Sequence, residues 1–182
     1  MPVHTPAIWS SKIPSRVHIF LWLLTKNKIL TRDNLSKCRN VEDSSCLFCS
    51  EQESIHHLFF DCATAKVMWY EISVLLSLQI GENFESVGSK WLCNKRFMVV
   101  NIVSSAALWS LWKLRNDLCF QRSVWKDMSK LWSRVWDMIN NWKLLCPLSN
   151  LPSLEQVAEG LKDFISRPGR IQWKESASRL LG

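Results

Sequence analysis

The sequence predicts an all-α fold, in which a small N-terminal helical domain is followed by a Trp-rich helical hairpin. Apolar residues recur at intervals of three and four along four segments, which is the spacing of one face of an α-helix. Gly and Pro residues separate these segments. Hydrophobic residues make up 47% of the 182 residues and 11 residues are Trp, so the helices have ample apolar surface to pack together.

The first half of the chain is expected to hold two short helices and one long helix. Pro14 is well placed to begin the first, because the first turn does not need its missing N–H. The run 16–26 that follows has apolar residues along one face. Thr31 is expected to cap a second, short helix. A long helix is predicted from His57 to a point before Gly81.

The second half of the chain is expected to form a pair of antiparallel helices. The two predicted helices cover residues 91–122 and 124–145, with a short break at 121–123 between them. Pro147 and Pro152 then end the helical pattern. The apolar face of the second helix consists of Trp125, Met128, Leu131, Trp132, Val135, Trp136, Ile139 and Trp142.

These patterns divide the chain into four parts. Residues 1–80 are expected to form the N-terminal domain, with residues 1–11 as a loose lead-in. Residues 81–90 contain two Gly and are expected to form a linker. Residues 91–146 are expected to form the hairpin, and residues 147–182 a weakly structured tail with a weak helix at 153–165.

The polar loop of the N-terminal domain carries a pattern typical of zinc ligands. Cys46, Cys49, His57 and Cys62 have the spacing C-x2-C-x7-H-x4-C. Zinc prefers four sulfur or nitrogen ligands in a tetrahedron, and four protein ligands leave no open position for water chemistry. The loop has little apolar surface of its own, so metal binding would supply its folding energy. We therefore expect one structural Zn²⁺ and a zinc-stapled helical domain.

The spacing leaves some ligand alternatives open. His57 and Cys62 would lie about 140° apart on a regular α-helix, so one of them must lie before the regular helix begins. His56 is an alternative to His57, and Cys38 is a spare candidate. The remaining cysteines, Cys93, Cys119 and Cys146, lie among apolar neighbours and are expected to be core thiols.

Several short motifs around this loop resemble one known family. They are Ile8–Trp9, IPSRVHIFLWLL at 13–24, LTRDNL at 30–35, CLFC at 46–49 and ESIHHLFFDCATAKVMW at 53–69. Their order and spacing resemble the zinc-binding domain that follows the reverse transcriptase in plant LINE-type (non-LTR) retrotransposons. The family motif has its His directly before Leu-Phe, which implies His57 as the ligand. The stretch 108–120 resembles the Trp-rich region that such elements carry downstream.

The resemblance and the charge pattern together suggest a role in binding nucleic acid. Residues 1–40 carry seven Lys or Arg and one acidic residue, and the whole chain has a net charge of +7. Such a surface favours sequence-tolerant contact with the phosphates of RNA or DNA. The candidate contact residues are Arg16, Lys26, Lys28, Arg32, Lys37 and Arg39.

The sequence shows no catalytic motif beside the zinc-ligand pattern and the basic residues. We therefore expect a non-enzymatic protein without a small-molecule substrate. The aspartates of the hairpin, Asp117, Asp127 and Asp137, do not converge on one helical face. The alternatives are a scaffold that binds a protein partner through the Trp-rich helices, or a retrotransposon remnant without a selected function. The sequence has no predicted signal peptide or membrane span, so we expect an intracellular protein, with nucleus or cytoplasm left open.

Overall fold

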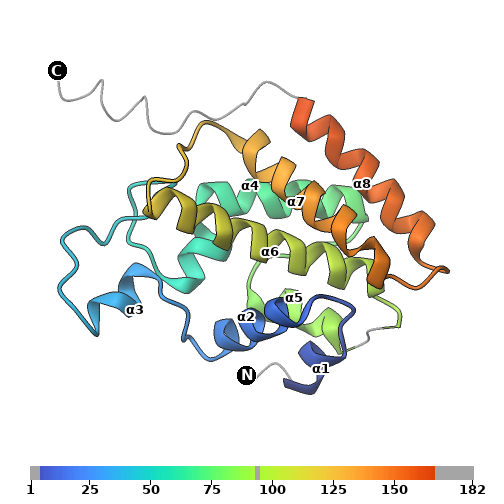
Figure 1. The fold of residues 1–182 in the computed structure, drawn as a ribbon, viewed down its shortest axis with the longest axis horizontal. Coiled ribbons are helices and arrows are strands. Elements are labelled where there is room, and N and C mark those ends of the chain that lie inside the picture. Colours follow the sequence, from blue (N-terminus) through green and yellow to red (C-terminus); the bar gives the residue numbers. More distant parts are fainter. Residues whose placement is uncertain (1–4, 93–94, 167–182) are drawn as a thin grey trace.

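The computed structural model describes residues 5–92 and 95–166 and confirms the all-α fold (Figure 1). The described residues contain no strand, and their helical elements follow one another along the chain. In order, these elements are α1 (Thr5–Ser10), α2 (Ser15–Thr25), α3 (Arg32–Ser36), the π-helical turn η1 (His57–Asp61), α4 (Ala63–Leu76), α5 (Phe84–Trp91), α6 (Met98–Cys119), α7 (Met128–Trp142), the 3-10 turn η2 (Lys143–Leu145) and α8 (Leu151–Ser166).

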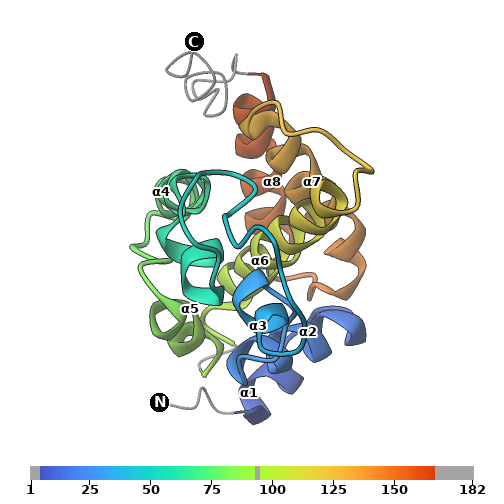
Figure 2. The same ribbon diagram turned by 90° about the vertical axis from the view of Figure 1, so that its left-hand side faces the viewer.

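Helix α6 is the centre of the molecule, and α2, α4, α5 and α7 all pack against it (Figures 1 and 2). Its 22 residues are buried on nearly every side between Asn101 and Leu111, as expected of a helix surrounded by others. The buried apolar residues form a single cluster that extends from Ala7 to Phe164. Among the described residues, no helix combines the length and the apolar character needed to cross a bilayer.

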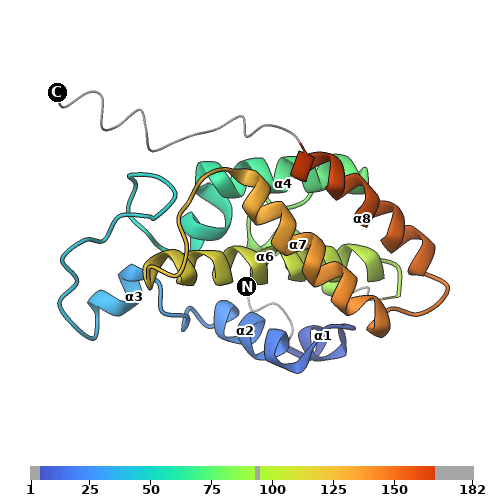
Figure 3. The same ribbon diagram turned by 45° about the horizontal axis from the view of Figure 1, so that its top comes forward.

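Helices α6 and α7 form the expected pair, but their connection is longer than the sequence indicated. The connection covers residues 120–127, and Asp127 ends it by accepting a hydrogen bond from the backbone N–H of Ser129. Helix α8 then packs along α7 (Figure 3). It occupies residues 151–166 of the predicted tail, whereas residues 167–182 of that tail lie outside the described residues, as does Cys93.

Two helices were not expected from the sequence. Helix α1 lies within the predicted lead-in, and α5 lies within the predicted linker 81–90. Helix α5 begins with a capping box, in which the Asn83 side chain accepts from the N–H of Ser86 and the Ser86 hydroxyl accepts from the N–H of Asn83. Its buried residues Val87 and Trp91 join the common core. The division into domains stays a prediction.

Candidate metal centre

The two cysteines of the C-x2-C pair lie in a closed turn that we call the knuckle, residues 45–52. Ser45 and Gln52 form an isolated antiparallel bridge. The N–H of Cys46 donates to the carbonyl of Glu51 at 2.7 Å, and just outside the bridge the N–H of Glu53 donates to the carbonyl of Ser44 at 2.9 Å. These backbone bonds tie together the two ends of the turn that carries both thiols.

The other two candidate ligands are brought together by the π-helical turn η1. The N–H of Cys62 donates to the carbonyl of His57 at 2.7 Å, which is the i to i+5 bond of a π-helix. This bond closes one turn over five residues, so it places His57 and Cys62 on the same side. Cys62 itself has an extended backbone, with φ of −56° and ψ of 138°, and α4 begins after it. A regular α-helix would have separated the two side chains.

The four side chains meet in one place, with their ligand atoms all within 4.8 Å of one another. The Sγ atom of Cys62 lies 3.9 Å from that of Cys46 and 3.8 Å from that of Cys49. Thiolates around a zinc ion, with bonds of about 2.3 Å, would be separated by about 3.8 Å in a regular tetrahedron. The Nε2 atom of His57 lies 3.1 Å from the Cys49 Sγ. The arrangement could therefore hold a zinc ion.

The other candidate ligands lie outside this cluster. The exposed His56 ring places Nδ1 2.7 Å from the Asp61 carboxylate, so the structure brings His57 into the cluster and directs His56 elsewhere. Cys38 is exposed. Cys119 is half-buried and Cys146 is buried, and neither belongs to the cluster.

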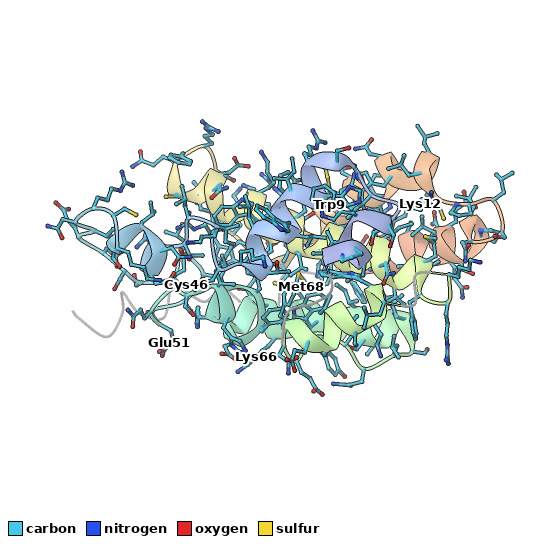
Figure 4. All side chains as sticks on the ribbon, turned by 90° about the horizontal axis from the view of Figure 1, so that it is seen from below. Trp9, Lys12, Cys46, Glu51, Lys66 and Met68 are labelled. Atoms are coloured by element: carbon cyan, nitrogen blue, oxygen red, sulfur yellow. The ribbon has the colours of Figure 1, made fainter. Side chains whose placement is uncertain are left out.

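The cluster is partly shielded from water, and this changes how its groups hold protons. Cys46 and Cys62 are buried, whereas Cys49 and His57 are half-buried (Figure 4 shows the position of Cys46 near one end of the molecule). The hydrogen bond with Cys62, together with burial, raises the pKa of the Cys46 thiol, and the same bond lowers the pKa of Cys62. Burial raises the pKa of Cys49 and lowers the pKa of His57.

Residues 3–69 match the model of a family described as zinc-binding in reverse transcriptase. This segment is similar to a reverse transcriptase zinc-binding domain. The match includes all four clustered residues and covers less than half of the chain. The comparisons with curated proteins and with solved structures found no match.

A buried ion pair joins the segment 3–69 to the central helix α6. The Glu53 carboxylate, which is 0% exposed, accepts from Nη2 of Arg115 at 2.6 Å and from its Nε at 3.1 Å. It also accepts from the backbone N–H of Arg32 at 2.8 Å, so it caps the start of α3. Glu53 was not among the candidate site residues predicted from the sequence. Arg115 lies among the apolar residues of a helix predicted to be buried. A charged residue at such a position needs an acidic partner, and this was the available sequence signal.

Aromatic packing also holds the knuckle against the rest of the protein. Phe48, between the two cysteines, is fully buried, and its ring meets that of Trp125 edge-on with centroids 4.9 Å apart. Trp125 belongs to the connection between α6 and α7. The knuckle therefore packs, through Phe48, against the second half of the chain.

The basic residues predicted to contact nucleic acid lie mainly on the surface. Five of the six are exposed, and Arg32 is the exception because its guanidinium bonds both the carboxylate and the carbonyl of Asp43, at 2.7 and 2.8 Å. Lys37 donates to the side chain of Asn34 at 2.7 Å. The exposed residues are Arg16, Lys26, Lys28, Lys37 and Arg39.

Proposed function

We propose that this chain is a non-catalytic module in which one zinc ion, bound by Cys46, Cys49, His57 and Cys62, fixes the knuckle to the helical core. The convergence of these four ligand atoms within 4.8 Å carries the proposal. Four protein ligands complete the tetrahedron that zinc prefers in structural sites, and the ion would contribute folding energy rather than chemistry. The family match of residues 3–69 supports the same assignment.

The arrangement of the hairpin aspartates supports a role other than catalysis. Asp117 is paired with Arg134 at 2.8 Å, and Asp127 caps the start of α7. Asp137 is exposed. Since Asp117 and Asp127 serve different local contacts and Asp137 is exposed, we infer that they do not form the group that two-metal chemistry would need.

Metal analysis of the purified protein tests the proposed zinc site. We expect about one zinc per chain after purification under reducing conditions. The Cys49→Ser variant should lose the metal, whereas the Cys38→Ser variant, which changes an exposed thiol outside the cluster, should keep it. A metal-free wild-type protein would overturn the proposal, and so would a Cys49→Ser variant with full zinc content.

We also propose that the module derives from the reverse transcriptase polyprotein of a plant LINE-type element and binds RNA or DNA without strong sequence preference. The exposure of Lys26, Lys28, Lys37 and Arg39 on the α2–α3 side favours phosphate contacts. The Trp side chains of α6 and α7 are buried or half-buried, which makes a protein partner at those helices the weaker candidate. A remnant without a selected function is the other alternative.

A salt titration tests the nucleic-acid proposal. Binding to random single-stranded RNA or DNA should weaken steeply as salt is added, because each phosphate contact releases bound counterions. Absence of binding at low salt would remove this function and leave the zinc proposal intact.

A further inference from the structure

A small cavity lies where α2, α6 and α7 meet, and none of the four candidate zinc ligands lines it. Figures 1 and 3 show α7 crossing α6 while α2 runs along another side of it. The cavity has a volume of about 140 Å³. Its lining consists of Arg16 from α2, Trp109, Ser110 and Lys113 from α6, and Arg134 and Met138 from α7.

Three cationic side chains reach this cavity from three different helices. Arg16 and Lys113 are exposed, and neither has a carboxylate partner among the described residues. Arg134 gives one N–H to Asp117 at 2.8 Å, and a guanidinium has five N–H donors. The cavity therefore retains a strong excess of positive charge and of hydrogen-bond donors.

The hydroxyl of Ser110 gives an independent indication of a ligand. Ser110 is 2% exposed, and its Oγ has no hydrogen-bond partner. A buried hydroxyl without a partner costs free energy, and such groups in native proteins call for an explanation such as a missing water or ion. Ser110 and Lys113 are three residues apart on α6, so their side chains lie on the same face of the helix. Since Ser110 lines the cavity, a turn of its side chain would let its hydroxyl donate to an oxygen-rich anion bound beside Lys113.

The size and chemistry of the cavity favour a phosphate group. A water molecule has a share of roughly 30 Å³ in the liquid, so the cavity has room for a group several times larger. A phosphate carries negative charge and several acceptor oxygens, which match three cations and one hydroxyl that approach from different directions. We propose that the cavity between α2, α6 and α7 binds one phosphate group, either as a free phosphoanion or as part of a nucleic-acid backbone.

Equilibrium dialysis with radiolabelled inorganic phosphate tests this proposal on the full, zinc-loaded chain at fixed ionic strength. We expect saturable binding that drops about tenfold in Ser110→Ala and in Lys113→Ala, because each loses a hydrogen bond to a charged group. The stability of Ser110→Ala should not fall, because the lost hydroxyl has no partner in the protein. If Ser110 had only a structural role, Ser110→Ala would bind phosphate as tightly as the wild-type protein.

Two matched variants serve as controls. Ser105→Ala removes another buried hydroxyl without a partner from α6, away from this cavity. Lys66→Ala removes one positive charge from α4, on a different side of the molecule (Figure 4). Both should keep wild-type phosphate affinity. No saturable phosphate binding below about 10 mM would overturn the proposal, and so would equal affinities in all four variants.

A short single-stranded oligonucleotide distinguishes the two sources of phosphate. If the site takes a nucleic-acid backbone, which rests on the nucleic-acid proposal above, inorganic phosphate should compete with the oligonucleotide and Lys113→Ala should weaken both ligands. If only inorganic phosphate binds, the site is one for free phosphoanions. Oligonucleotide binding without any phosphate binding would overturn the cavity proposal alone, because zinc content is measured separately in each variant.

Discussion

At the scale of single residues, Glu53 links three separate segments of the molecule. Its carboxylate bonds Arg115 on α6 and the first N–H of α3, while its backbone closes the knuckle. Arg115 also places its guanidinium 5.4 Å from the ring of Trp112. A buried charge is tolerated only when its partner remains in place, so both residues of this pair are needed together.

The Arg115→Met variant tests the importance of this pair. It should lower the free energy of unfolding by about 3–5 kcal/mol, because it leaves the Glu53 carboxylate buried without its partner. Urea unfolding of the zinc-loaded protein measures the change. Lys162→Met is the matched control, since it breaks an exposed pair with Glu159 and should cost no more than about 0.5 kcal/mol. Similar losses in both variants would contradict the structural role of Glu53.

The protonation of the cluster predicts how zinc binding depends on pH. The raised pKa values of Cys46 and Cys49 mean that both thiols hold their protons at neutral pH in the metal-free protein, whereas the lowered pKa of His57 keeps its ring neutral. Zinc must displace the thiol protons, so its apparent affinity should rise about tenfold per pH unit for each proton released. Competition with a chromophoric chelator between about pH 6 and pH 8 measures the apparent zinc affinity at each pH. A constant affinity would contradict the prediction.

At the scale of secondary-structure elements, Gly81 sets the turn between α4 and α5. Its φ is +91°, and a Cβ at this position would lie 2.1 Å from the ring of Trp69. The Trp69 ring cannot move easily, because it stacks on Phe60 and its indole N–H donates to the carbonyl of Phe59 at 2.7 Å. The turn therefore requires a residue without a side chain.

The Gly81→Ala variant should lower the free energy of unfolding by about 1–3 kcal/mol, through backbone strain and crowding of Trp69. Gly160→Ala is the control. Its Cβ would meet only the flexible tip of Leu75 at 2.5 Å, and Ala favours a helix by up to about 1 kcal/mol. Thermal unfolding compares the two, and an equal effect at both positions would contradict our account of the turn.

The elements that the sequence predicted are those with a strong local signal. Helix α2 follows Pro14 and shows its apolar face clearly, and the C-x2-C-x7-H-x4-C spacing indicated the four residues that converge. Helix α5 was missed because the two glycines of residues 81–90 suggested a linker, although Asn83 and Ser86 already carried the cap. Local patterns could not predict the pairing of Glu53 with Arg115, because these residues are 62 positions apart in the sequence.

At the scale of the whole molecule, the structure predicts that zinc removal acts locally at first. The knuckle and the turn η1 depend on the proposed ion, whereas α7 and α8 pack against each other without it. Treatment with a chelator should therefore increase hydrogen exchange in residues 44–62 while α7 and α8 keep most of their protection. Unchanged exchange in residues 44–62 would show that the ion does not stabilise the knuckle.

X-ray absorption at the zinc edge tests the central claim most directly. For the purified, zinc-loaded protein we predict three sulfur neighbours at about 2.3 Å and one nitrogen neighbour at about 2.0–2.1 Å, the sphere that Cys46, Cys49, Cys62 and His57 would supply. A zinc coordination sphere with fewer than three sulfur ligands, or with a water oxygen as a ligand, would contradict the proposed structural site.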